Sequence, residues 1–254
     1  YGFAFTPEGV SAFGLLSCPS ARSQRGRSFA DNDADLRRRL ARVPGQAPTA
    51  FSLRPGVPLP WPAFRDGEAA LLRYLGEDAA PLPRRVLAAL RWLEGWSGGA
   101  PPPYDPRLLT DPVPPPVGPE REIAAAVFHM TTQNPYLAPV ARGDAATNTA
   151  LSDPPFAAYL LRTLVFSKAL SYPHGVVPGF NYVALAYALL LRRLGGRPIS
   201  EVPEEELGAF FSGLQHAPYQ RLIAALQEQP LLRELAATPL YGALLLRVAL
   251  TPGA

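Results

Sequence analysis

Proline is the feature that most limits what this chain can fold into, because 31 of its 254 residues are proline. That share is more than double the usual share of about 5%. Proline lacks a backbone N–H and breaks a helix interior, but it fits the first turn of a helix. The sequence therefore predicts many short elements joined by stiff connectors, with helices that begin at or near prolines.

Between these prolines, the spacing of apolar residues predicts mostly helices. Residues 1–16 alternate aromatic and small side chains around a turn and predict a β-hairpin, and residues 50–53 predict another short strand. Residues 55–62 are expected to be irregular and 172–179 to form a turn. The expected helices span 31–43, 66–76, 83–96, 119–133, 153–170, 180–194, 203–214, 218–228, 230–237 and 239–250. The expected fold class is mainly α, an irregular multi-helix bundle with a small N-terminal β element, and an α+β fold is the alternative.

A proline-rich stretch suggests a division into two lobes. Residues 98–119 read GGAPPPYDPRLLTDPVPPPVGP, a composition that favours an extended and fairly stiff connector. Residues 1–97 are then an N-terminal lobe with short strands, a basic arm and helices. Residues 120–254 are an all-helical lobe.

Composition narrows the class of protein and its compartment. Hydrophobic residues make up 48% of the chain, which is enough for a sizeable core and argues against a disordered chain. Cys18 is the only cysteine, so no internal disulfide forms and a reducing, cytoplasmic setting or a viral particle fits best. The longest apolar run, Tyr182–Leu191, is ten residues long and predicts a buried helix, not a membrane span.

The formal charge excess lies in the first sixth of the chain. Residues 1–42 hold seven arginines against four acids, whereas the rest of the chain is balanced. A basic arm of this kind is either a solvated loop and helix face or a contact for nucleic acid, and such a contact would be sequence-blind and salt-sensitive. The residues that would carry it are Arg22, Arg25, Arg27, Arg37, Arg38 and Arg39.

A second candidate interaction motif lies in the connector. Pro101, Pro102 and Tyr104 fit the Pro-Pro-x-Tyr pattern that WW domains read as a polyproline helix. The segment is pre-extended and its tyrosine can fill a groove. The alternative is coincidence in a chain that is rich in proline throughout.

Familiar catalytic and metal-binding patterns do not occur in the sequence. It contains no phosphate-binding glycine loop and no G-x-S-x-G elbow, and its three histidines lack zinc-site spacing. We therefore expect no cofactor and no metal. The one group suspected of catalysis is Lys168 with Tyr172 and His174, because Lys168 is the only lysine and lies in an apolar helix, where its pKa could fall. The alternative is that its ammonium group simply reaches water.

Three hypotheses follow from these observations. The leading one is a non-catalytic structural or interaction subunit of a larger intracellular or viral assembly, which docks on other protein subunits through apolar surfaces of the helical lobe and through the basic arm or the proline connector. The second is a nucleic-acid-binding component of a ribonucleoprotein or DNA-binding complex that uses the arginine-rich arm. The third is an enzyme with an unfamiliar site near Lys168, Tyr172 and His174.

Overall fold

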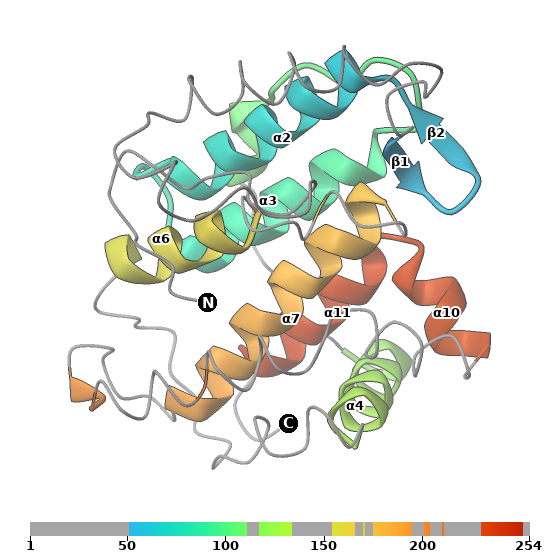
Figure 1. Cartoon of the computed structure of the whole chain (residues 1–254). Helices are drawn as coiled ribbons and strands as arrows, with labels where there is room; N and C mark the ends of the chain where they lie inside the picture. The colour runs from blue at the N-terminus through green and yellow to red at the C-terminus, as the bar shows by residue number, and fades with distance from the viewer. Residues whose placement is uncertain are drawn as a thin grey trace, which may run out of the picture.

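The computed structural model describes residues 51–110, 117–133, 154–165, 170, 175–194, 201–203, 210 and 230–250. These residues form seven α-helices and one two-stranded antiparallel sheet (Figure 1), which confirms the mainly α fold class with a small β element. In chain order the elements are β1 (Phe51–Arg54), β2 (Val57–Leu59), α2 (Trp61–Gly76), α3 (Leu82–Glu94), the 3₁₀ helix η2 (Pro106–Leu109), α4 (Pro119–Thr132), α6 (Pro154–Leu164), α7 (Val176–Leu194), α10 (Pro230–Ala236) and α11 (Leu240–Ala249).

Prolines mark most of the helix starts, as expected. Pro119 and Pro230 are the first residues of α4 and α10, and Pro239 directly precedes α11. The first helical position tolerates proline because its N–H has no partner within the helix. The expected elements before residue 50, the helix over 218–228 and most of the helix over 203–214 lie outside the described residues.

The small sheet corrects one expectation. Residues 55–62 were expected to be irregular, but Val57–Leu59 form β2, which pairs with β1 so that Phe51 faces Leu59 and Ser52 faces Pro58. Gly56 makes the reversal with a φ of 81°. Proline is acceptable in β2 because every strand of a two-stranded sheet is an edge. Pairing with β1, and not the composition of residues 57–59, accounts for the formation of this strand.

Two helix starts also differ from expectation. Helix α2 begins at Trp61 instead of Asp66, with a proline in its first turn. Helix α7 begins at Val176, inside the segment expected to be a turn, because Pro178 again falls in the first turn, where no amide is needed. Helix α6 spans Pro154–Leu164, and the expected end at Leu170 stays a prediction because residues 166–169 lie outside the described residues.

Helix α7 is the centre of the core. Every residue from Val176 to Leu191 is buried, so the apolar run at Tyr182–Leu191 is a buried helix as expected. Helices α3, α6, α10 and α11 and strand β1 all pack on α7, and α2 and α3 form a helical hairpin above it (Figure 1). A helix that is apolar on all sides needs such cover on all sides.

Backbone of β1 lies directly against the start of α7. Gly175, just before that helix, has a φ of 100°, and a Cβ atom there would lie 2.7 Å from the carbonyl oxygen of Ser52. Only glycine satisfies both the conformation and the close approach. This contact joins the hairpin to the central helix.

One buried amide holds α7 to the turn between α10 and α11. The Nδ2 group of Asn181 donates to the carbonyl oxygens of Ala236 and Thr238, each at 2.9 Å. Its Oδ1 accepts from the backbone N–H of Gly242 at 3.0 Å. Asn181 is 1% exposed, so water does not substitute for these bonds. The side chain satisfies three backbone groups that the turn would otherwise leave unpaired.

A buried guanidinium likewise bonds backbone carbonyl groups near the end of α2. Arg85 donates from Nε to the carbonyl oxygen of Ala80 at 2.5 Å and from a terminal nitrogen to that of Leu75 at 3.2 Å. It also forms an ion pair with Asp78 at 3.3 Å. Carbonyls at a helix C-terminus lack partners within the helix, so this arginine is an internal cap.

Elements of both expected lobes share one apolar core. Strand β1 and helix α3 pack against α7, and α2 packs against α6. The division at residues 98–119 stays a prediction, because these contacts describe packing and not independent folding.

Buried tyrosines predict a loss of stability in alkali. Burial raises the pKa of Tyr182 to about 12, and it also raises the pKa values of Tyr187 and Tyr241. The unfolded chain, with tyrosine pKa values of about 10, therefore loses these protons first as the pH rises. We expect the free energy of unfolding to fall above pH 10 by about 1.4 kcal/mol per pH unit for each such tyrosine.

Urea titrations at several pH values above 9 test this expectation, with Tyr182→Phe as the control that should show a shallower slope. Stability that stays constant with pH across the ionisation range of free tyrosine would show that these phenols are not buried.

Candidate interaction site

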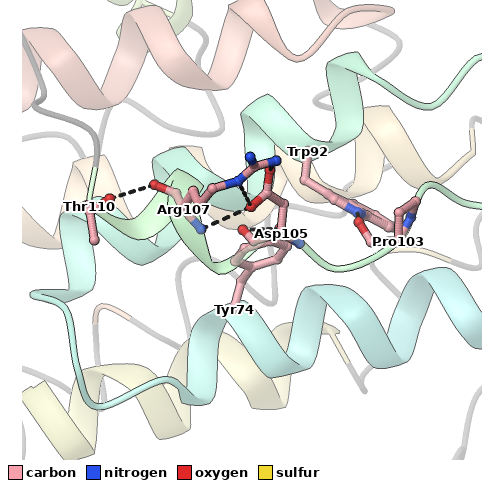
Figure 2. A network of polar contacts seen from close by, with 6 residues as sticks. All are labelled: Tyr74, Trp92, Pro103, Asp105, Arg107 and Thr110. Atoms are coloured by element: carbon pink, nitrogen blue, oxygen red, sulfur yellow. Dashed lines mark hydrogen bonds and ion pairs between the residues drawn. The ribbon is translucent and has the colours of Figure 1, made fainter.

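The proline connector lies in a groove on the α2–α3 hairpin. We name this the connector groove and define it by Arg73, Tyr74 and Glu77 at the end of α2 and Trp92 in α3. Figure 2 shows Tyr74 and Trp92 reaching the connector from the two helices. Amphipathic periodicity places both side chains on the inner faces of their helices, where they are 0% and 3% exposed. Their polar tips are turned toward the connector backbone.

Trp92 donates its indole N–H to carbonyl groups of the proline run. Its indole N–H lies 3.2 Å from the carbonyl oxygens of both Pro102 and Pro103. Proline residues have no N–H of their own, so their carbonyls are the only main-chain groups that a partner can bond. A tryptophan N–H that donates to a proline-rich segment within an aromatic groove is a recurring mode of polyproline recognition.

Tyr74 holds the backbone of the residue after the motif. Its hydroxyl donates to the carbonyl oxygen of Asp105 and accepts from the N–H of the same residue, both at 3.0 Å. Burial is the main cause of the raised pKa of Tyr74. The phenol therefore stays protonated at neutral pH and keeps its ability to donate.

Tyr104 fills the end of the groove. Its ring lies 4.6 Å from the ring of Tyr74 and 3.8 Å below the guanidinium of Arg73, and its hydroxyl lies 3.4 Å from a carboxylate oxygen of Glu77. Burial, followed by the charge of Glu77, raises the pKa of Tyr104. A tilted ring contact, a cation above the ring and a polar partner for the hydroxyl together favour tyrosine at this position.

Beyond the motif, a short 3₁₀ helix anchors the connector. Asp105 accepts from the backbone N–H of Arg107 at 3.0 Å and forms an ion pair with its side chain at 2.8 Å (Figure 2). These hydrogen bonds lower the pKa of the Asp105 carboxyl. Leu109, at the end of η2, is buried. Residues 101–105 form neither helix nor strand and contact α2 and α3, residues 106–109 form η2, and residues 111–116 lie outside the described residues, so an extended connector over 98–119 stays a prediction.

A second surface of interest is the outer side of α4. Ala124, Val127, Phe128 and Thr131 of this helix are buried. We name Val117, Ile123 and Ala126 the α4 strip; Val117 precedes the helix, and the other two are three residues apart, so they share one side of it, next to the buried face. Val117 is 69% exposed and Ile123 is 51% exposed. The exposed charged side chain of Glu122 lies one turn before Ala126 on the same helix.

Only some of the predicted site residues lie within the part of the chain that the structure describes. Pro101, Pro102 and Tyr104 lie together in the connector groove, as part of the fold. Lys168, Tyr172 and His174 lie outside the described residues, as does every arginine of the basic arm: Arg22, Arg25, Arg27, Arg37, Arg38 and Arg39. These functional predictions therefore stay predictions.

Sequence reasoning missed the residues that hold the motif. Tyr74 and Trp92 read as ordinary core positions, and their bonds join residues far apart in the chain. Their one signal is that both are aromatic residues with a polar tip, which is a residue type suited to a surface that is apolar on one side and polar on the other.

Three further findings concern the chain and its described part. No family model, curated protein or solved structure matches this chain. Among the described residues, no cluster of histidine, cysteine and acidic side chains is suited to a metal ion. No helix in those same ranges has both the length and the apolar character that a membrane crossing requires.

One prediction tests the Trp92 bond. Replacing Trp92 with phenylalanine keeps a ring but removes the donor to two carbonyls, which we expect to cost about 1 kcal/mol of unfolding free energy beyond the loss of ring area. Trp96→Phe is the matched control, because the buried indole N–H of Trp96 has no hydrogen-bond partner. Chemical denaturation of both variants measures the difference, and equal losses would contradict the assigned bond.

Proposed function

We propose that this chain is a non-catalytic subunit of a larger assembly and that it docks on another protein subunit through the α4 strip. The observation that carries the proposal is the exposure of apolar side chains on one side of a helix whose adjacent side is firmly packed. Val117 and Ile123 have the largest exposed fractions among the exposed large apolar residues of the described ranges.

Helix α4 is fixed to the body by specific contacts, so the strip is presented on a rigid support. The hydroxyls of Thr131 and Tyr241 lie 3.0 Å apart in the interior. At the other end of the helix, Glu120 forms a paired hydrogen bond and ion pair with Arg247 of α11. A rigid helix loses little conformational freedom on binding, which favours recognition.

The pattern of residues on α4 also suits an interface. The exposed carboxylate of Glu122 borders its apolar residues, because Glu122 and Ala126 are four residues apart on one side of the helix. Protein interfaces commonly combine an apolar core with a polar and charged rim. A strip of this size forms part of a standard interface of about 800 Å² per partner, so neighbouring surface completes it.

Comparative capture of partners tests the proposal. The tagged chain is purified from its source cells as wild type, as Ile123→Glu and as Leu240→Glu. Leu240 is 43% exposed at the start of α11, so it is the control for an added surface carboxylate on a different helix.

We expect a stoichiometric partner with the wild type and the control, and at least tenfold weaker binding, about 1.4 kcal/mol, with Ile123→Glu. Light scattering on the purified chain across a wide concentration range shows whether the partner is a second copy. A strictly monomeric chain whose co-purifying proteins are the same in all three forms contradicts the proposal.

A further inference from the structure

We propose that the connector groove is a peptide-recognition site for a proline run that ends in Tyr-Asp. In this view residues 101–105 fill the site in cis, and the groove takes the same sequence in trans when the cis segment is withdrawn. The inference does not depend on the proposed function of α4, because it concerns a different surface and a different partner. The partner is defined by its chemistry: an extended proline-rich peptide with a tyrosine at its end.

The first argument is that the groove contacts the connector through features that any such peptide carries. Trp92 bonds the carbonyls of Pro102 and Pro103, and Tyr74 bonds both main-chain groups of Asp105. Main-chain bonds provide affinity without depending on how the segment is tethered. A free peptide in the same extended conformation offers the same atoms.

The second argument is that the Tyr104 position discriminates between side chains. The ring contacts the ring of Tyr74 and the guanidinium of Arg73, and Glu77 is the polar partner of the hydroxyl. A site that contacts an aromatic ring and also bonds its hydroxyl binds tyrosine better than phenylalanine. A segment needed only to join two helices does not require this selectivity.

The third argument concerns withdrawal of the cis segment. Gly98 and Gly99, directly before the prolines, have φ values of 135° and 65°. A Cβ atom at Gly99 would meet no atom within 4 Å, whereas one at Gly98 would lie 3.3 Å from a methyl carbon of Val57. A pair of glycines next to a stiff proline segment is a suitable hinge. The tether gives the cis segment a millimolar effective concentration, so the intact chain excludes free peptide.

Binding of the chain's own sequence to opened variants of the full chain tests the proposal. The probe is the synthetic peptide Ala-Pro-Pro-Pro-Tyr-Asp-Pro, which corresponds to residues 100–106. The first variant is Tyr104→Ala, which vacates the end of the groove. The second replaces residues 101–104 with Gly-Ser-Gly-Ser. Calorimetry measures affinity, and thermal melting measures stabilisation by the peptide.

We expect both opened variants to bind the peptide at least tenfold more tightly than the wild type and to melt at a higher temperature when it is present. Peptides with phenylalanine or alanine in place of the tyrosine should bind progressively more weakly. Adding Trp92→Phe to either variant should weaken binding again, which a non-specific contact would not show.

A Tyr104→Ala variant that melts cooperatively and binds none of the peptide overturns the proposal, whatever the behaviour of the replacement variant. Equal binding of the tyrosine and alanine peptides overturns it too. If Tyr104→Ala itself does not fold, the proposal requires that the tyrosine peptide restore a cooperative melt and that the alanine peptide fail to do so.

Discussion

Replacing Asn181 with alanine should lower the free energy of unfolding by about 3–5 kcal/mol, because three buried backbone groups lose their partner at once. Those groups are the carbonyls of Ala236 and Thr238 and the N–H of Gly242. Helices α7, α10 and α11 meet at this side chain, so the loss acts on the centre of the core. Urea denaturation followed by circular dichroism measures the change.

Two further variants make the Asn181 test specific. Asn181→Asp keeps an acceptor for Gly242 but turns lone pairs toward two carbonyls, so it should be at least as destabilising at neutral pH. Its stability should partly recover in mild acid, because a protonated carboxyl donates one hydrogen bond. The control is Thr132→Ala, which removes a solvent-facing bond to His129 and should change stability by less than about 0.5 kcal/mol. A small effect of Asn181→Ala would contradict the assigned bonds.

The second large effect is expected at Gly175. Gly175→Ala places a Cβ atom 2.7 Å from the Ser52 oxygen and 2.9 Å from backbone atoms of Leu53, at a φ of 100°. Neither neighbour moves easily, because both belong to β1. We expect a loss of about 3–4 kcal/mol, of which about 1–3 kcal/mol is backbone strain and the rest is steric overlap.

Gly56→Ala separates these two contributions. Gly56 has a φ of 81°, but a Cβ atom there meets nothing within 4 Å. Its alanine variant therefore reports strain alone and should lose clearly less stability in the same denaturation experiment. Equal losses at the two glycines would show that β1 does not lie against the start of α7.

Local signals were sufficient for several elements. The range expected for the helix after Pro119 agrees with α4 to within one residue, and those expected after Pro230 and Pro239 agree closely with α10 and α11. In each case proline at the start, acids or apolar periodicity in the first turns and a break at the end act within a few residues. Such features are visible in the sequence because neighbours along the chain determine them.

Long-range contacts account for what the sequence did not reveal. Strand β2 has only three residues, one of which is a proline, and its pairing with β1 stabilises it. Gly175, directly before α7, packs against the backbone of β1. No window of local sequence contains either contact, so periodicity and propensity could not predict them.

The connector groove combines features that the sequence predicted with features that it did not. Composition predicted a stiff extended segment, and the pattern of Pro101, Pro102 and Tyr104 marked the residues of interest. The sequence could not predict that the segment packs on its own protein, because the hydrogen bonds that hold it come from Tyr74 and Trp92, on two helices that precede it. The sequence identified the peptide, and the structure identified the groove that holds it.

Hydrogen exchange at the backbone amide of Asp105 tests the central claim, that Tyr74 and Trp92 hold the proline connector in a defined groove. This amide donates to the hydroxyl of Tyr74, whereas the prolines before Tyr104 have no amide to exchange. The account predicts that exchange at Asp105 is slower than in an unfolded chain by at least about a hundredfold, and that Tyr74→Phe removes most of this protection in a protein that remains folded. Exchange at the unfolded-chain rate in the wild type, or equal protection in Tyr74→Phe, would contradict it.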